Sequence, residues 1–500
     1  MFVQTLRPFK FSNAIGAMYQ KGQLITATIS DLAEGDKCYA KLPDGMSVFI
    51  RGTLAIGDTV EAMIYKAKKS YLEAELTNLL SPSPLRTEPR CEVFGICGGC
   101  KWQHLNYDAQ LQQKSKQVLD ALTHIGGFRN IAMLPPIGAT RIYQYRNKVD
   151  FSLSTSRYLL PSEINASHFS KRNDFALGFH APQRYDKVID IEQCYIAPEE
   201  ANLVLSAVRA FALEHRLTIY DTHTHEGFLR NLVVRKAFRT NELMVNLVTS
   251  WHDVALMKSL LHALQHSLGA SLTTFVNNVS TKKNTIAFGE EEFIVFGKGF
   301  ITEQLGEYRF NISANSFFQT NSEQAERLYE TALRFAGLSG NEIVYDLYCG
   351  TGSISIFISK HCQKVFGIEL VESAVRDAVE NACENQVRNC TFKMLDLMKF
   401  ETLRSELISF GAPDVVITDP PRAGMHPKAV QTMLQFQPKK IIYVSCNPVS
   451  LARDAKLICE SGRYRLATVQ AVDMFPHTNH IESVALFETV NLETVKPDSI

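Results

Sequence analysis

Residues 341–352 read NEIVYDLYCGTG, an apolar run that ends in an acid and a glycine-rich turn. The run has the length and composition of a buried strand. Gly350 and Gly352 allow a tight turn whose backbone N–H groups approach a ligand closely. The next residues, SISIFISKHC (353–362), are typical of the helix that follows such a turn. The stretch predicts the first strand–turn–helix unit of a nucleotide-binding α/β domain.

The same alternation continues to the end of the chain. Strand-like runs follow at KVFGIE, TFKMLD, DVVITDPP, KKIIYVSC, YRLATVQAVD and ESVALFE. Asp346, Glu369 and Asp396 end the first three strands, and Glu369 follows Asp346 by 23 residues, a spacing that suits an acid binding ribose hydroxyls. Ligands bind at the carboxyl ends of strands in open α/β sheets. We therefore expect a Rossmann-like domain over residues 314–490.

The fourth and fifth strands end in groups that favour methyl transfer. Two prolines in DPPRAG (419–424) stiffen the turn that carries Asp419, as a methyltransferase needs to hold a planar base beside S-adenosylmethionine. Cys446 ends the adjacent fifth strand, where a thiolate, deprotonated or nearly so, could attack an electron-poor ring carbon. Glu482 begins the final strand and can act as a general base. A cysteine with a carboxylate predicts methylation of carbon rather than nitrogen.

The region before residue 314 has two different patterns. Short strand-like stretches separated by the turn signals EGD, DGM and IGD predict a small β-barrel of the OB type over residues 16–80. Three prolines in SPSPLRTEPR (81–90) indicate a linker. Strands and helices then mix over residues 91–313. The predicted fold is a multidomain α/β protein with a small N-terminal barrel, a central α+β domain and a C-terminal Rossmann-like domain.

The composition indicates an ordinary globular protein. The 500 residues are 45% hydrophobic and 21% charged, with a formal net charge of zero. No apolar run approaches the roughly 18–20 residues of a membrane span, and the N-terminus lacks a signal-peptide pattern. We expect a cytoplasmic protein with no membrane partner. Nothing resembles a coiled coil, so we also expect a monomer.

Four of the 11 cysteines have the spacing of a metal site. Cys91, Cys97 and Cys100 follow the pattern C-x5-C-x2-C, and Cys194 lies far downstream in DIEQCYIAP. The glycines of GICGGC would let this loop fold around a metal group. Four thiolates suit tetrahedral zinc or an iron–sulfur cluster, and spacing alone leaves both open.

Several motifs together resemble a known family. FFQTN (317–321), DLYCGTGSISI, DPPRAGMHP, YVSCNPVSLARD and DMFPHTNHIE are similar to those of the S-adenosylmethionine-dependent RNA uracil-C5 methyltransferases, which act on 23S ribosomal RNA or tRNA. Residues 20–78 resemble the TRAM domain of that family, and CEVFGICGGCKWQHL resembles its iron–sulfur motif. The resemblance covers most of the chain, with the motifs in the order of the family.

The resemblance implies roles for individual residues. Positions similar to the S-adenosylmethionine contacts of the family are Gln319, Tyr348, Glu369 and Asp419. Cys446 matches the nucleophile that adds to uracil C6, and Glu482 matches the base that removes the C5 proton. The cysteines that match the ligands of a [4Fe–4S] cluster are Cys91, Cys97, Cys100 and Cys194. The implied substrate is a uridine flipped out of an RNA loop, in 23S rRNA by preference and otherwise in tRNA.

Further positions interleave aromatic and cationic side chains, as RNA-binding surfaces do. These positions are Trp102, Tyr145-Arg146-Asn147-Lys148 and Lys171-Arg172. In GFLRNLVVR, Asn231 stands where the family usually has histidine. His426 and His477 flank the predicted pocket by motif position, without a defined role.

Three other functions are compatible with parts of the sequence. An amino-group methyltransferase also uses an Asp-Pro-Pro turn, but it needs no cysteine and usually has an aromatic residue where this chain has Arg422. A noncatalytic RNA-binding assembly factor would not need both Cys446 and Glu482. A dinucleotide oxidoreductase is disfavoured because Ser355 replaces the third glycine of its fingerprint.

Overall fold

A computed structural model of the chain describes residues 19–32, 37–164, 171–182, 184–283, 287–399 and 409–490. The chain divides into two compact units. One comprises Met1–Glu88 and His104–Asn106, and the other comprises Pro89–Gln103 and Tyr107–Ile500. No helix in the described ranges is long and apolar enough to cross a membrane.

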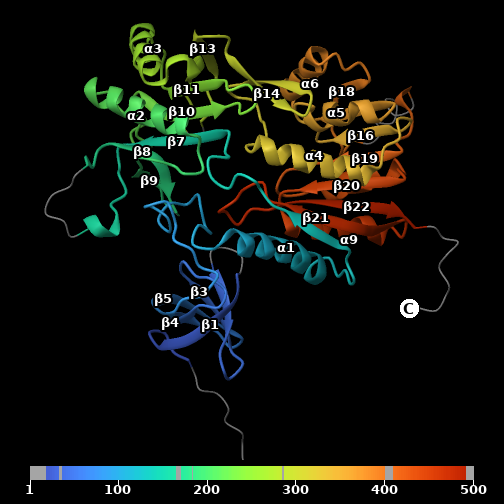
Figure 1. Cartoon of the computed structure of the whole chain (residues 1–500), viewed down its shortest axis with the longest axis horizontal. Coiled ribbons are helices and arrows are strands. Elements are labelled where there is room, and N and C mark those ends of the chain that lie inside the picture. Colours follow the sequence, from blue (N-terminus) through green and yellow to red (C-terminus); the bar gives the residue numbers. More distant parts are fainter. Residues whose placement is uncertain are drawn as a thin grey trace, which may run out of the picture. The chain divides into compact units, whose positions relative to one another are not determined.

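The first unit is a closed five-stranded barrel in the order β1-β2-β3-β5-β4 (Figure 1). Its strands are β1 (Leu24–Leu32), β2 (Lys37–Lys41), β3 (Ser47–Arg51), β4 (Thr59–Ala67) and β5 (Tyr71–Ser81). Exposed and buried residues alternate along β1, as the pleat of a half-buried strand requires. Closure pairs all the strands and leaves no free edge. The predicted small barrel is confirmed.

A seven-stranded sheet lies at the centre of the chain, in the order β13-β12-β11-β10-β7-β8-β9. The strands are β7 (Lys148–Ser154), β8 (Ala176–Ala181), β9 (Arg184–Asp190), β10 (Leu229–Lys236), β11 (Leu243–Thr249), β12 (Leu272–Val279) and β13 (Glu291–Phe296). Helices α2 (Glu199–Glu214) and α3 (Val254–Leu268) pack on one face, where they share a hydrophobic core with alternate residues of β7 and β10. Only this face of β7 and β10 contributes to that core.

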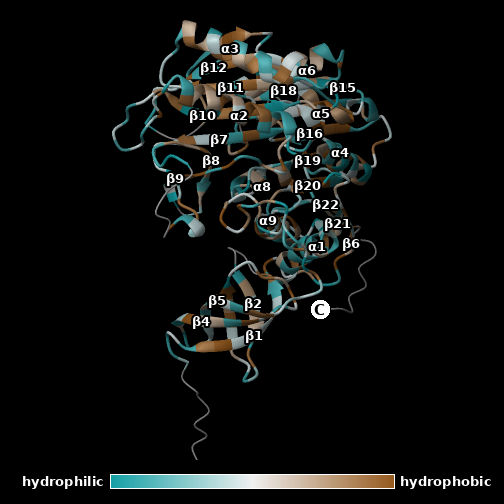
Figure 2. Cartoon of the chain, turned by 60° about the vertical axis from the view of Figure 1, so that its left-hand side comes forward, coloured by the Kyte–Doolittle hydropathy of each residue, from teal (hydrophilic) through white to brown (hydrophobic). Residues whose placement is uncertain are grey.

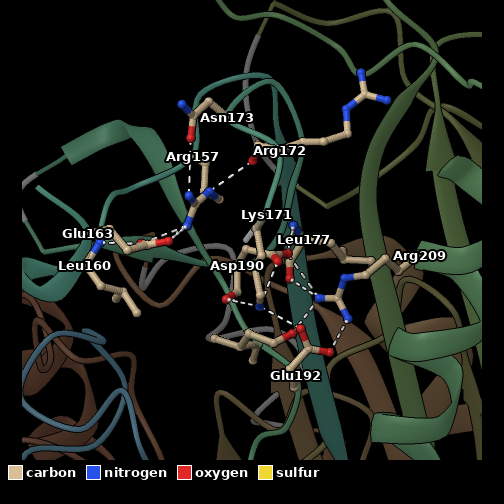
Figure 3. Close-up of polar contacts among 11 residues, drawn as sticks. Arg157, Leu160, Glu163, Lys171, Arg172, Asn173, Leu177, Asp190, Glu192 and Arg209 are labelled. Atoms are coloured by element: carbon tan, nitrogen blue, oxygen red, sulfur yellow. Dashed lines mark hydrogen bonds and ion pairs between the residues drawn. The ribbon is translucent and has the colours of Figure 1, made fainter. Parts of the chain in front are cut away.

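An ion-pair network ties the edge of this sheet to α2 (Figure 3). The Asp190 carboxylate accepts hydrogen bonds from Arg209 at 3.1 Å and from the backbone N–H of Leu177 at 3.0 Å. Lys171 pairs with Asp190 at 3.1 Å and with Glu192 at 2.6 Å. Arg172 pairs with Asp174 at 2.6 Å. Because these carboxylates already neutralise both cations, the structure does not favour Lys171 and Arg172 as phosphate contacts.

The C-terminal sheet has eight strands in the order β18-β17-β16-β19-β20-β22-β21-β6. They are β16 (Ile343–Leu347), β17 (Lys364–Glu369), β18 (Cys390–Met394), β19 (Val415–Thr418), β20 (Lys440–Ser445), β21 (Tyr464–Val472), β22 (Glu482–Thr489) and β6 (Met133–Ile137). The first five are parallel, and β22 is antiparallel to β20. Hydrophobic residues recur along these strands in Figure 2. The predicted Rossmann-like sheet is present.

Helices cover both faces of the C-terminal sheet. One hydrophobic core includes residues of α4 (Ser322–Ala336), α5 (Ser353–Ile358) and α6 (Glu372–Glu384). The core on the other face includes residues of α1 (Tyr107–His124), α8 (Pro427–Gln435) and α9 (Pro448–Glu460). A separate hairpin, β14 (Phe300–Leu305) with β15 (Tyr308–Ser313), packs in the first core.

Two elements of the C-terminal layers come from far upstream in the sequence. Strand β6 pairs in parallel with β21, with Val469 opposite Met133. Helix α1 contributes Val118, Ala121 and Leu122 to the core beside α9. The sequence analysis placed both elements within residues 91–313, together with the central sheet. Their attachment brings α1 next to the loop that leads into Glu482.

Candidate active site

Cys446 and Glu482 meet at the carboxyl end of β20. Ser445 of β20 lies opposite Ser483 of β22 in antiparallel register, so the next step along each strand places Cys446 opposite Glu482. The Ser483 hydroxyl also donates to the Ser445 carbonyl oxygen at 3.4 Å. The nucleophile and the base expected from the sequence are therefore cross-strand neighbours.

Asparagine and proline end the strand and start the next helix immediately after Cys446. The Asn447 side chain caps α9 by accepting a hydrogen bond from the Val449 N–H at 3.0 Å, and Pro448 occupies the first helical position. The Asn447 amide also donates to the Arg422 carbonyl oxygen at 3.1 Å. Cys446 is thus fixed beside the turn that carries Asp419.

The Asp419 turn is held tightly against α9. Gly424 has a positive φ of 76°, and a Cβ there would lie 2.6 Å from atoms of Arg453 and Asp454. The Asp454 carboxylate accepts hydrogen bonds from the Met425 N–H at 2.7 Å and from the Tyr443 hydroxyl at 2.6 Å. A residue larger than glycine at position 424 would push the turn away from the site.

Acidic side chains converge on the same edge of the sheet. Burial raises the pKa of Asp419 to about 6, and it raises the pKa of Asp346 to about 7 with a further contribution from Asp419. Burial and Asp419 together raise the pKa of Glu482 well above its usual value. Clustered carboxylates create a negative potential that stabilises a cation such as a sulfonium ion. This edge is therefore electrostatically suited to S-adenosylmethionine.

The thiol of Cys446 differs from the sequence expectation. Burial, followed by the charges of Glu482 and Asp419, raises its pKa to about 11, although Arg422 lowers it slightly. This shift favours the protonated thiol in the protein without ligands, whereas the sequence led us to expect a thiolate, deprotonated or nearly so. The physical reason is that the same carboxylates that favour a cationic ligand disfavour a nearby thiolate.

Tyr348 follows β16, and Glu369 ends the neighbouring strand β17 at this edge. The Glu369 carboxylate accepts hydrogen bonds from the N–H groups of Gly350 at 3.1 Å and of Leu370 at 2.7 Å. Tyr348 has a positive φ of 62° in the turn after β16, and burial raises its pKa to about 12. Both residues border the glycine-rich turn, as their sequence positions predicted.

Gln319 reaches this region from outside the sheet. Asn147, which is buried, donates through its side chain to the Gln319 carbonyl oxygen at 2.8 Å. Asn321 caps α4 and donates to the Met474 carbonyl oxygen at 3.0 Å. The FFQTN segment is therefore tied to the loop of residues 473–481, and its Phe317 side chain is 71% exposed.

The 473–481 loop precedes Glu482 and rests on polar residues of α1. Lys114 is fully buried and donates to the Asp473 carboxylate at 2.6 Å and to the Phe475 carbonyl oxygen at 2.9 Å. Gln110 accepts a hydrogen bond from the His477 N–H at 2.8 Å. The sequence analysis missed both residues. One signal of their burial was present in the sequence. Positions 110, 113 and 114 are polar, but they lie on the same helix face as the apolar residues 118, 121 and 122.

His477 connects this loop to the cysteine-rich segment. Its carbonyl oxygen accepts hydrogen bonds from the N–H groups of Lys101 at 2.8 Å and Trp102 at 2.9 Å, and its φ is 66°. Its ring lies 4.2 Å from the Tyr143 ring, and burial lowers its pKa to about 4. The neutral imidazole is therefore structural. His426 caps α8 by accepting from the Lys428 N–H at 3.2 Å.

The interleaved aromatic and cationic residues predicted to contact RNA are largely internal. Trp102 and Tyr145 are 7% and 2% exposed, and the Tyr145 hydroxyl donates to the Pro476 carbonyl oxygen at 3.0 Å. Lys148 pairs with Asp150 at 3.0 Å. Apart from Arg146, whose guanidinium donates to the Lys148 carbonyl oxygen at 2.9 Å, this segment supports the 473–481 loop more than it offers a stacking surface.

The four motif cysteines line one cavity of about 270 Å³. They are Cys91, Cys97, Cys100 and Cys194, and all are free thiols. Burial raises the pKa of Cys100 to about 12 and that of Cys194 to about 11. Among the described residues, no group of three or more His, Cys, Asp or Glu side chains is placed to hold a metal ion. The structure therefore does not support a preformed single-ion site here, and it does not show the predicted cluster.

Comparisons with known proteins agree with the motifs. Residues 260–490 match the family model tRNA (Uracil-5-)-methyltransferase, and residues 19–77 match the TRAM domain. An uncharacterized RNA methyltransferase of Chlorobaculum tepidum is 52% identical over 94% of this chain and 97% of its own length. One from Bacteroides thetaiotaomicron is 41% identical over 91% of this chain and 99% of its own.

A solved structure resembles nearly the whole chain. The Pyrococcus abyssi tRNA (uracil-54, C5)-methyltransferase, in complex with S-adenosyl-L-homocysteine, is 29% identical and has a TM-score of 0.69. The match covers 93% of this chain and 100% of that one. Both the sequence and the fold of this protein are therefore shared with enzymes that modify RNA.

Proposed function

This chain belongs to the S-adenosylmethionine-dependent RNA uracil-5 methyltransferase family, and we propose that it methylates C5 of one uridine in 23S ribosomal RNA. The observation that carries the proposal is the opposition of Cys446 and Glu482 across the register of β20 and β22. The ribosomal substrate is favoured by the combination of a TRAM domain with the four-cysteine motif. A tRNA uridine is the second candidate, because the solved Pyrococcus abyssi relative acts on tRNA.

The reaction begins at the sulfur of Cys446. The thiol gives its proton to water as RNA binds, and the positive charge of Arg422 and the N-terminus of α9 stabilise the thiolate that remains. The sulfur then bonds to uracil C6, and the electron pair of the C5–C6 double bond moves into an enolate with nucleophilic density at C5. S-adenosylmethionine, when bound, supplies an electrophilic methyl group on its sulfonium sulfur.

Glu482 completes the turnover. Once C5 carries the methyl group, the carboxylate accepts the remaining C5 proton. The electron pair of that C–H bond restores the C5–C6 double bond, and the bond between C6 and the Cys446 sulfur breaks. Because its pKa is raised well above the usual value, the Glu482 carboxylate holds an accepted proton more firmly than an exposed glutamate does.

We propose that the methyl donor binds at three strand ends beside the FFQTN segment. We propose that its contacts are Gln319, Tyr348, Glu369 and Asp419. Glu369 lies at the end of β17, where an acid can accept ribose hydroxyls, and Asp419 adds negative charge near the donor. The turn is open at Gly350, where a Cβ would meet nothing within 4 Å, whereas a Cβ at Gly352 would lie 2.9 Å from Phe392.

The four cysteines fit an iron–sulfur cluster better than one ion. A single zinc ion needs four sulfurs about 2.3 Å from one centre, whereas a [4Fe–4S] cluster accepts one thiolate at each of four separate irons. Free thiols around one cavity, with apolar neighbours such as Val93 and Ile196, suit the larger group. We assign it a structural role, because Lys101 and Trp102 of this segment hold the His477 carbonyl oxygen. Anaerobically purified protein without iron or visible absorption would contradict this assignment.

Mapping of 5-methyluridine by mass spectrometry tests the function. A strain lacking this gene should lose the modified base at one position, and the wild-type gene should restore it in 23S rRNA. Restoration only in tRNA would transfer the assignment to tRNA. A gene encoding Cys446→Ala should restore neither, whereas Cys459→Ala, a matched change at the other end of α9, should restore the modification fully. S-adenosylmethionine binding without transfer to any RNA would instead indicate a noncatalytic factor.

A further inference from the structure

The central sheet has a polar cavity on the face that its helices do not cover. Phe151 and Leu232 are cross-strand partners within the core shared with α2 and α3. The next pair, Ser152 and Asn231, therefore points to the opposite face. There the two side chains line a cavity of about 290 Å³, close to the lower end of the range for small-molecule sites.

Two polar groups of this cavity have no partner within the described part of the chain. Asn231 is only 5% exposed, yet its side-chain amide makes no hydrogen bond to any described residue. The Nδ1 atom of His180 is buried and also lacks a partner among those residues. Buried polar groups are normally hydrogen-bonded, so the His180 nitrogen indicates that a ligand completes the site, and the Asn231 amide is available to contact that ligand.

The remaining lining favours a neutral, planar ligand over a phosphate. Asp221 and Asp186 bring two carboxylates that would repel an anion. The Arg230 guanidinium lies 3.8 Å from the centre of the Tyr220 ring and is held by the carbonyl oxygens of Ser280 and Lys282. Arg230 is only 5% exposed, so it forms a fixed part of the wall beside Tyr220. The hydroxyl groups that line the cavity belong to Ser152, Ser154, Thr155, Ser156 and Thr222.

The cavity shares a sheet face with the segment that leads to Gln319. Asn231 and Arg235 are four residues apart on β10, so they point the same way, about 13 Å apart along the strand. Arg235 donates to the carbonyl oxygens of Ala314 at 3.2 Å and Ser316 at 2.6 Å. The exposed ring of Phe317 follows directly. The cavity and the segment that leads to Gln319 therefore lie along one face of the sheet.

We propose that this cavity binds an unpaired nucleobase of the RNA substrate, a few nucleotides from the target uridine, with Asn231 reading the edge of the base. An asparagine amide offers one donor and one acceptor side by side, which match the N6 and N7 groups of adenine. The base lies in the cavity beside the hydroxyl-bearing strand end. The assignment rests on the proposed RNA substrate, but the contact itself does not require methyl transfer.

Photo-crosslinking of the full-length protein to RNA from a strain lacking the gene tests the contact directly. Crosslinked nucleotides should map to peptides containing residues 152–156 or 220–231. Crosslinks that map only elsewhere would overturn the assignment. If the protein crosslinks here but methylates no RNA, the proposed function fails while this contact stands.

Substitution of Asn231 tests the reading of the base. Asn231→Leu keeps the side-chain volume but removes both hydrogen-bonding groups, so the Kd for RNA should rise about tenfold or more. The Kd for S-adenosylmethionine and the melting temperature should stay unchanged, which shows that the variant folds. Asn341→Leu, the same change at an exposed position before β16, should leave RNA binding unaltered. Equal RNA affinity for Asn231→Leu and wild type would overturn the proposal.

A free nucleotide is the alternative source of the same chemistry. AMP at millimolar concentration should bind weakly, and RNA should displace it from wild-type protein. AMP binding that RNA does not displace would assign the cavity to a free nucleotide and overturn the RNA contact.

Discussion

Helix α9 has a cysteine near each end, and the two ends have very different surroundings. Cys446 precedes the helix cap, and Cys459 lies in its last turn. Burial raises the pKa of both thiols to about 11. Only Cys446 also faces Glu482, Asp419 and Arg422. The two thiols have similar pKa values but different charged neighbours, so burial alone does not identify the nucleophile.

Replacing each thiol in turn should give the largest difference in methyl-transfer rate between the two ends of α9. Cys446→Ala should lower the rate of methyl transfer more than roughly a thousandfold, as loss of a nucleophile does in other enzymes. Cys459→Ala should keep the wild-type rate. The measurement is transfer of labelled methyl groups to RNA at saturating S-adenosylmethionine. Comparable losses in both variants would remove the distinction between the two thiols.

Neutralising Glu482 should separate the formation of the bond between Cys446 and uracil C6 from its breakage. Glu482→Gln should lower turnover by about 10²–10⁴-fold, because the C5 proton has no acceptor, and RNA should remain covalently attached to Cys446. Denaturing gels of labelled RNA with protein measure this adduct. The Cys446→Ala/Glu482→Gln double variant should form none. An unattached product at the wild-type rate would exclude Glu482 as the base.

The same variant should change the reactivity of one thiol only. Because the charge of Glu482 raises the pKa of Cys446, Glu482→Gln should lower that pKa and speed alkylation at pH 8. Alkylation of Cys459 should not change, since burial dominates its shift. Mass spectrometry of peptides after iodoacetamide treatment reports both sites in one experiment.

The acids buried at the Cys446 edge of the sheet should lower the free energy of unfolding at neutral pH when no ligand is bound. The pKa of Asp346 is raised from 3.8 to about 7, so its stabilising contribution is complete below pH 3.8 and is lost as the pH rises to about 7. Asp346→Asn should therefore increase the free energy of unfolding at pH 8 by at most about 4 kcal/mol. The gain should vanish near pH 4. A variant that is less stable at pH 8 would contradict this account.

The smallest effect should come from the helix cap itself. Asn447→Ala removes the cap of α9 and the hydrogen bond to the Arg422 carbonyl oxygen, so the free energy of unfolding should fall by about 1 kcal/mol. Ser461→Ala, at the other end of the helix, should cost less, because its hydrogen bonds are local: the hydroxyl donates to the Ile458 carbonyl oxygen and accepts from the Arg463 N–H at 3.3 Å. Urea unfolding curves of the two variants measure the difference.

Local patterns in the sequence predicted much of the candidate site. Asp346, Glu369, Asp419 and Cys446 each follow an apolar run, and the carboxyl ends of parallel strands necessarily meet at one edge. The small barrel was equally predictable, because closely spaced turn signals indicate several short strands in few residues. These features depend on residues near one another in the chain.

Other features depend on contacts between distant segments. Nothing local indicates that β6 pairs with β21, or that Lys114 meets Asp473 across more than 300 residues. The protonated state of Cys446 was also missed, because a pKa is set by burial and by charges that only the fold assembles.

From the sequence alone came the succession of strands in the last domain, the residues at their ends and the family to which the chain belongs. Only the tertiary structure decided which face of the central sheet stays polar, where Asn231 points, and what holds the 473–481 loop. The physical reason is that periodicity encodes whether a residue is buried, whereas its partners depend on elements that arrive from elsewhere in the chain.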